Sequence, residues 1–132
     1  MTRSTLPARR LRVMVIDDDE LACAAMSRLL RLAGFEVHAL ASPLGASKEI
    51  SRLRIQVVVV DINMPAMRGE RLVALFRGTP RLRNLPVVLI SGEEAEDLER
   101  LAEAVDADAT LPKADMKRLA EVVLEASQRK RS

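Results

Sequence analysis

The sequence is poor in the residues that support several common kinds of site. Its 132 residues include one cysteine, one histidine, two phenylalanines, and neither tryptophan nor tyrosine. A single cysteine excludes an internal disulfide and fits a reducing compartment. The one histidine, His38, falls in an early predicted strand away from the candidate site described below, which argues against a histidine metal site or a catalytic triad. With so few aromatic residues, the core must be aliphatic.

The chain also lacks an apolar run of membrane-spanning length and an apolar segment near its start that would resemble a secretory signal. We therefore expect a cytoplasmic protein without membrane insertion. Its net charge of +2 is too small to argue for direct nucleic-acid binding. The length predicts one domain over 11–127, between a basic leader (1–10) and a basic tail (128–132). The basic residues interpreted as solvated tails are Arg3, Arg9, Arg10 and Arg12, then Arg129, Lys130 and Arg131.

Strand and helix patterns alternate five times along the chain. The sequence predicts strands over 11–16, 35–40, 56–62, 87–90 and 109–111, and helices over 20–33, 43–54, 69–77, 94–105 and 115–127. Gly34 is expected to close the first helix, and Ser42 to cap the second with Pro43 as its first residue. This alternation predicts an α/β fold, a five-stranded parallel sheet that is doubly wound, with helices on both faces.

The third predicted strand, VVVVD, ends an uninterrupted valine run in Asp61. Four valines in a row are typical of a strand covered on both faces, because helices on either side leave no solvent face. Met64-Pro65 and Gly69 cannot continue that strand. Asp61 is therefore expected where a buried strand reaches the surface.

Polar residues follow four of the five predicted strands. In an open α/β sheet these positions meet at one edge, beyond the carboxyl ends of the strands. Clustered carboxylates repel one another unless a cation lies among them, and an oxygen-only set favours Mg²⁺. Lys113 and the Ser91 hydroxyl could then contact a phosphoryl group, with Asp61 as the nucleophile. The residues expected at this edge are Asp17, Asp18, Asp19, Asp61, Ser91 and Lys113.

Several of these residues also have a simpler interpretation. Asp19 or Glu20 can serve only as the N-cap of the first helix, with Asp17 and Asp18 kept for metal. Ser91 can cap the acidic helix that follows it, and Lys113 taken alone can be a surface lysine. Asp61 is the hardest to explain in this way.

Together these residues resemble the receiver domain of two-component response regulators, with a flavodoxin-like (βα)5 fold. The resemblance covers about 11–127 and rests on the segments IDDDE, VVVVDINMPAMRGE, PVVLISGE and LPK. It implies a phosphoprotein in signal transduction that forms an aspartyl phosphate with Mg²⁺ as cofactor, taking the phosphoryl group from a histidine kinase or histidine phosphotransfer protein. The implied roles are metal binding by Asp17, Asp18, Asp61 and the backbone carbonyl of Asn63, phosphoacceptor for Asp61, switch hydroxyl for Ser91 and phosphate partner for Lys113.

The sequence departs from the family pattern at four positions. Arg68 replaces the usual aspartate, which would place a positive charge near the rim of the site, and Gly92 replaces a common alanine. Thr110 stands where an aromatic switch residue is frequent. Ala114 replaces the proline that follows the lysine, which makes the usual cis peptide costly and would aim Lys113 differently.

Two helices offer surfaces to a partner. The first carries one apolar stripe (Ala22, Ala25, Met26, Leu29 and Ala33) and leaves Leu21, Ala24 and Leu32 outside it. These are either simple helix formers or a docking face for the phosphohistidine donor. The fourth is acidic over an inner stripe of Leu98, Leu101, Ala102 and Val105, which favours a solvated face but would also suit a basic partner.

We predict a phosphoacceptor module, not an enzyme beyond phosphorylation and dephosphorylation of itself, that signals by protein contact to an output protein as a stand-alone regulator or relay shuttle. The sequence leaves a homodimer open. One alternative is a degenerate receiver that acts without phosphate. Another is a phosphohydrolase, although the expected acid two residues after the nucleophile is replaced by Asn63.

Overall fold

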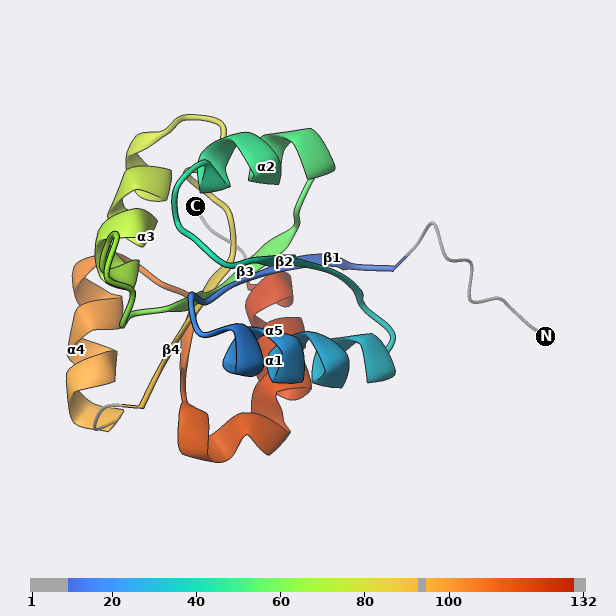
Figure 1. The fold of residues 1–132 in the computed structure, drawn as a ribbon. Coiled ribbons are helices and arrows are strands. Elements are labelled where there is room, and N and C mark those ends of the chain that lie inside the picture. The colour runs from blue at the N-terminus through green and yellow to red at the C-terminus, as the bar shows by residue number, and fades with distance from the viewer. Residues whose placement is uncertain (1–9, 93–94, 130–132) are drawn as a thin grey trace.

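The computed structural model describes residues 10–92 and 95–129, which form one five-stranded parallel sheet flanked by helices (Figure 1). The strand order is β2-β1-β3-β4-β5, which confirms the doubly wound α/β fold. None of the described helices is long and apolar enough to cross a bilayer. The strands are β1 (Arg12–Ile16), β2 (Glu36–Leu40), β3 (Val57–Asp61), β4 (Val87–Ser91) and β5 (Ala109–Pro112).

Helices cover both faces of the sheet (Figure 1). One face packs against α1 (Glu20–Leu32) and α5 (Leu119–Gln128). The other packs against α2 (Ala46–Leu53), α3 (Gly69–Gly78) and α4 (Ala95–Ala104). The valines of β3 alternate between the two faces and are all fully buried, which explains why this strand tolerates no polar residue before Asp61.

The second helix begins later than predicted. The Ser42 hydroxyl accepts a hydrogen bond from the Leu44 N–H and makes a turn, and Gly45 follows with φ of 79°. A positive φ cannot belong to a right-handed helix. The expectation that Ser42 caps this helix and Pro43 starts it is therefore wrong, and α2 begins at Ala46.

The last helix also differs from the prediction. Lys113–Arg118 form a 3₁₀-helix, η2, and the α-helix proper begins only at Leu119. Asp115 departs from helical geometry, with φ −105° and ψ 31°. Short 3₁₀ segments are common at helix starts, and apolar spacing does not distinguish them from the first α turn.

The first helix buries a different stripe from the one predicted. Its buried residues are Cys23, Met26, Ser27 and Leu30, of which only Met26 belongs to the predicted set. These four follow the i, i+3, i+4, i+7 spacing of a helix face, whereas the predicted stripe followed alanines that need no burial. As a result, Leu21 and Leu32 are 84% and 75% exposed. Gly34 has φ of 100° and donates to the Arg31 carbonyl, so it ends this helix as predicted.

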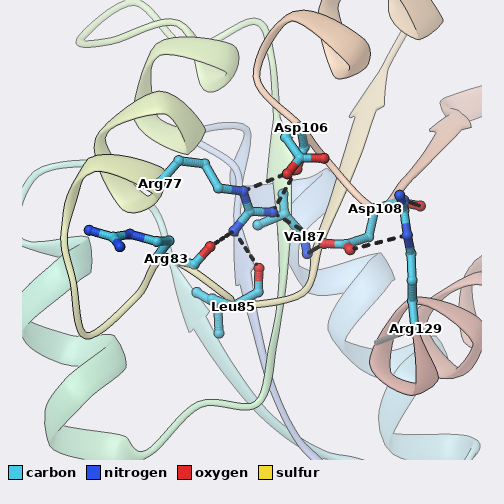
Figure 2. A network of polar contacts seen from close by, with 7 residues as sticks. All are labelled: Arg77, Arg83, Leu85, Val87, Asp106, Asp108 and Arg129. Carbon is cyan, nitrogen blue, oxygen red and sulfur yellow. Dashed lines mark hydrogen bonds and ion pairs between the residues drawn. The ribbon is translucent and has the colours of Figure 1, made fainter. Parts of the chain in front are cut away.

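The Arg77 side chain links several segments at the edge of the sheet where the strands begin. Its guanidinium donates to backbone carbonyls and to the carboxylate of Asp108 at 3.2 Å (Figure 2). The carbonyl acceptors belong to Arg83, Leu85 and Asp106, so one side chain joins α3, the loop before β4 and the end of α4. A planar guanidinium with five N–H donors suits such a junction.

Asp108 is the acidic centre of the same network. Its side chain is 1% exposed, and one oxygen accepts the Val87 N–H at 2.7 Å. Arg129 reaches it from the end of α5, with Nη1 3.2 Å from the Asp108 carbonyl oxygen and Nε 3.9 Å from a carboxylate oxygen (Figure 2). Arg129 therefore contacts the fold although its side chain is 52% exposed, and Arg12 does so through its Nε, which donates to the Arg54 carbonyl. Arg3, Arg9, Lys130 and Arg131 lie outside the described residues.

We expect Asp108→Asn to lower the free energy of unfolding by about 3 kcal/mol, because it leaves the largely buried Arg77 side chain without its counter-charge. Asp97→Asn is the matched control: its carboxylate pairs with Arg100 on the exposed side of α4, so the loss should be about 0.5 kcal/mol or less. Urea denaturation measures both. Equal losses in the two variants would contradict this account of the network.

Candidate functional site

The structure brings the polar residues of four strand ends together at the edge opposite the Arg77–Asp108 network. Asp17 and Asp18 follow β1, Asp61 ends β3, and Ser91 ends β4. One carboxylate oxygen each from Asp17, Asp18 and Asp61 lies within 4.8 Å of the others. Lys113 enters from the residue after β5. Parallel strands cause this convergence, because all of their carboxyl ends lie on one side of the sheet.

Two carboxylates of the site are almost completely buried, Asp17 at 0% and Asp61 at 2% exposure. Oδ1 of Asp17 accepts a hydrogen bond from the Asp19 N–H at 2.9 Å, whereas its Oδ2 has no hydrogen-bond partner. Burial raises the pKa of the Asp17 carboxyl above its usual range, and the charge of Asp61 adds to this; the Asp19 N–H and Lys113 offset it only in part. The site therefore holds more negative charge than its own residues neutralise.

Lys113 is the cation that partly balances these carboxylates. Its Nζ lies 3.3 Å from Oδ2 of Asp17 and 3.5 Å from Oδ2 of Asp61, and its side chain is 30% exposed. Burial lowers the pKa of Lys113, but the charges of Asp61 and Asp17 outweigh this and raise the pKa above its usual value. Lys113 is thus charged and directed into the site, and not a free surface lysine.

Ser91 and Asn63 form the remaining wall of the site. Ser91 is fully buried, and its hydroxyl oxygen accepts a hydrogen bond from the Asn63 side-chain amide at 3.3 Å. The backbone N–H of Asn63 donates to Oδ1 of Asp61 at 3.2 Å, which holds that carboxylate in place. The Ser91 hydroxyl therefore belongs to the site through Asn63.

Asp19 has a separate, structural role. Its carboxylate accepts hydrogen bonds from the N–H groups of Leu21 and Ala22, so it caps α1. This agrees with one of the two cap residues proposed from the sequence and leaves Asp18 to join Asp17 and Asp61.

The arrangement fits a hard divalent cation. The three carboxylates face a single ammonium group, the donor atoms are all oxygens, and the buried Oδ2 of Asp17 lacks a hydrogen bond. Mg²⁺ prefers one or a few carboxylates and keeps several water molecules for other ligands. An edge of this kind can hold Mg²⁺ beside Asp61.

Gly69 controls how closely α3 approaches Asp61, a role that the sequence analysis missed. A Cβ at this position would lie 2.3 Å from the carbonyl oxygen of Asp61 and 2.7 Å from Cα of Ile62. The Gly69 N–H also donates to the Ile62 carbonyl at 3.1 Å. Only glycine permits this contact, and the signal available in the sequence was a glycine eight residues after Asp61, in the segment VVVVDINMPAMRG.

The structure shows where the four residues that depart from the family pattern lie and what they contact. Arg68 is exposed at the start of α3 and pairs with Glu70 at 3.0 Å. None of the described peptide bonds is cis, and Nζ of Lys113, the residue before Ala114, lies within 3.5 Å of both the Asp17 and the Asp61 carboxylates. Thr110 is partly buried in β5, and Gly92 is exposed after Ser91.

The fold and the acidic edge define a doubly wound α/β domain of the flavodoxin-like type, with a site of oxygen ligands at the carboxyl ends of its strands. The chain belongs to the response regulator receiver domain family, whose model matches residues 13–124. Response regulators of this family act in two-component signalling.

Known relatives and structures agree with this assignment. The transcriptional regulatory protein PrrA of Mycobacterium leprae is 35% identical over 86 residues, which cover 65% of this chain and 36% of PrrA. The gliding motility regulatory protein of Myxococcus xanthus is 27% identical over 83% of this chain and 14% of its own length. The chain therefore spans about a third or less of the length of these relatives.

Solved structures match over almost their whole length. Chemotaxis protein CheY4 of Vibrio cholerae superposes with a TM-score of 0.81 at 24% identity, covering 89% of this chain and 98% of CheY4. A putative response regulator from Chloroflexus aurantiacus gives 0.84 at 22% identity, covering 92% of this chain and all of that one. At these identities the likeness shows the fold.

Gly69→Ala should lower the free energy of unfolding by about 2 kcal/mol or more, because the new methyl group forces α3 away from the Asp61 carbonyl. Gly78→Ala at the other end of α3 is the control: nothing lies within 4 Å of its Cβ position, and the better helix former should leave stability unchanged or raise it. Thermal denaturation compares the two. A Gly69→Ala protein as stable as the control would contradict the close approach.

Proposed function

We propose that this receiver domain accepts a phosphoryl group on Asp61 from the phosphohistidine of a kinase or phosphotransfer protein, and that it signals through protein contact in the cytoplasm. The observation that carries the proposal is the Asp61 carboxylate, which lies buried between Asp17 and Lys113 at the end of the central strand. A carboxylate in this position can act as a nucleophile toward phosphorus.

The transfer is a displacement at phosphorus. The P–N bond of the donor breaks and the imidazole nitrogen keeps the bonding electrons, while an Asp61 carboxylate oxygen forms the new P–O bond. Hydrolysis later restores the unphosphorylated protein: water attacks phosphorus, Asp61 leaves as a carboxylate and inorganic phosphate is released. Asn63 holds the carboxylate by its N–H, Lys113 supplies positive charge for the phosphoryl oxygens, and the Ser91 hydroxyl supplies a hydrogen bond.

The proposed cofactor is Mg²⁺. When bound, it supplies positive charge that offsets the repulsion between the carboxylates and an incoming phosphoryl group. The residues that would hold it are Asp17, Asp18, Asp61 and the backbone carbonyl of Asn63, the first three of which offer oxygens within 4.8 Å of one another.

Incubation with acetyl phosphate and Mg²⁺ should add one phosphoryl group per chain, because a small phosphodonor can reach Asp61 without a partner. Intact mass spectrometry detects the adduct. Asp61→Asn should abolish it, since the amide is not a nucleophile. Asp19→Asn is the matched control in the same acidic segment and should be labelled like the parent protein, because asparagine caps α1 equally well.

The same experiment separates the alternatives. No adduct under these conditions would contradict the proposal and favour a degenerate receiver that acts without phosphate. Sustained turnover of a small phosphomonoester, in place of one label per chain, would favour a phosphohydrolase.

We further propose that the start of α1 contacts the phosphohistidine donor. Leu21 is 84% exposed, and its N–H bonds to the cap residue Asp19, so it lies beside the acidic edge. A large exposed apolar side chain next to a reactive site suits a partner's surface.

Leu21→Glu should slow transfer from a phosphohistidine donor about tenfold or more while leaving labelling by acetyl phosphate unchanged, because only the partner contact is lost. Leu32→Glu is the control: Leu32 is also exposed, but it lies about 16 Å further along the same helix. Stopped-flow or gel assays with the phosphorylated donor measure the rates. Equal slowing in both variants would show that α1 charge, and not the face beside the site, sets the rate.

A further inference from the structure

A second concave site lies at the opposite edge of the sheet from the acidic residues. It is a cavity of about 270 Å³ between the end of α2 and the loop that joins α3 to β4. Its floor is aliphatic, and the side chains that form it are at most 7% exposed. These side chains are Ile50, Ile55, Leu82 and Leu85.

Two arginines, Arg54 and Arg81, stand over this aliphatic floor, and no aspartate or glutamate lines the cavity. Within 10–92 and 95–129, neither arginine takes part in an ion pair, in contrast to Arg52 with Glu49 or Arg77 with Asp108. Ser51 and Asn84 add polar groups to the same lining. We call this site the arginine cavity.

Arg54 occupies a backbone position that favours glycine. It follows α2 with φ of 56° and ψ of 48°, in the left-handed region, and its N–H donates to the Ser51 carbonyl. A non-glycine residue there costs about 1 kcal/mol. Among the described residues the Arg54 guanidinium forms no ion pair that would offset this cost, and it lines the cavity as a cation.

Further arginines add positive charge at this edge. Arg12 begins β1 beside Arg54, with its Nε 2.9 Å from the Arg54 carbonyl oxygen. In Figure 2 the side chain of Arg83 points away from the Arg77–Asp108 network, and its guanidinium has no ion-pair partner among the residues that the structure describes. Among the described residues, arginines without an ion-pair partner thus gather at the edge opposite the acidic site.

We propose that the arginine cavity docks an acidic segment of a partner protein, with one aliphatic side chain on the floor and carboxylates on Arg54 and Arg81. The volume lies just below the roughly 300–1,000 Å³ of pockets that enclose a whole small ligand, which suits a single side chain. Arginine pairs with carboxylates in a bidentate manner, and an aliphatic floor rewards a buried leucine-like group.

The lining favours protein over nucleic acid as the partner. Single-stranded nucleic acids are held largely by stacking on aromatic side chains, and the cavity is lined by none. A duplex needs contacts along a row of phosphates and would leave the aliphatic floor unused. The site also lies at the opposite edge of the sheet from Asp61, so the proposed docking needs no contact with the phosphoryl group.

The test uses the full chain and a fluorescein-labelled peptide with one leucine between two pairs of glutamates, followed by fluorescence anisotropy at low salt. Saturable binding is expected, and it should weaken about fivefold or more in each of Arg54→Gly and Arg81→Gln, because each removes a charge-assisted hydrogen bond. Replacing the peptide's leucine by serine, or its glutamates by glutamines, should also weaken binding.

Controls separate binding from folding. Arg54→Gly relieves the left-handed arginine, so its melting temperature should be equal to or above that of the parent protein while its affinity falls. Arg28→Gln removes an exposed arginine on α1, far from the cavity, and should bind like the parent. Asp61→Asn should bind like the parent as well, which distinguishes failure here from failure of the phosphoacceptor proposal.

Three results would overturn the inference. One is the absence of saturable peptide binding, and another is an affinity that Arg54→Gly and Arg28→Gln lower equally. The third is binding of a short DNA duplex that is tighter than peptide binding and lost in Arg54→Gly, which would assign the cavity to nucleic acid.

Discussion

The repulsion between Asp17 and Asp61 is the constraint on which the organisation of this domain depends. Two carboxylates, both almost fully buried, are held together at the ends of neighbouring strands and share one ammonium group, that of Lys113. Such a site is unfavourable by itself, because buried like charges raise each other's energy. The sheet can impose it because β1 and β3 are anchored by fully buried aliphatic side chains on both faces. The same cost makes the site receptive to a cation and to a group that changes its charge.

At the edge where the strands begin, by contrast, the charge of the buried carboxylate is compensated. Asp108 is also buried, but Arg77 and Arg129 both reach its carboxylate and one of its oxygens accepts the Val87 N–H, so its charge is compensated within the fold. A paired buried carboxylate is structural, whereas a poorly paired one remains available for chemistry. The two edges of the sheet therefore differ in role. The edge where the strands begin is held together by the Arg77–Asp108 network and has unpaired arginines on its surface. The edge where the strands end has excess negative charge, which a metal and a phosphoryl group can relieve.

Local sequence patterns predicted the strands and helices well where the residue types of one segment determine its structure. They failed where contacts between segments determine it. Each of the five strands occurs within a residue or so of its predicted bounds, because runs such as VVVVD have few other solutions in a soluble chain. Gly34 ended its helix as expected, since its φ is a property of glycine. The predicted start of α2 was wrong because the Ser42 hydroxyl accepts a hydrogen bond in a turn before the helix. The predicted buried face of α1 was wrong because Cys23 and Leu30, and not the neighbouring alanines, pack against the sheet.

The sequence by itself determined the parallel α/β order and the residues that follow each strand, because strand periodicity and the rule that parallel strands end on one side are local and topological. The order of the strands alone therefore places Asp17, Asp18, Asp61, Ser91 and Lys113 at one edge. Only the tertiary structure decided which of these are buried, that Gly69 must lack a side chain against the Asp61 carbonyl, and that Arg54 and Arg81 share one cavity. These last features depend on distances between segments far apart in the chain, which spacing along one segment does not encode.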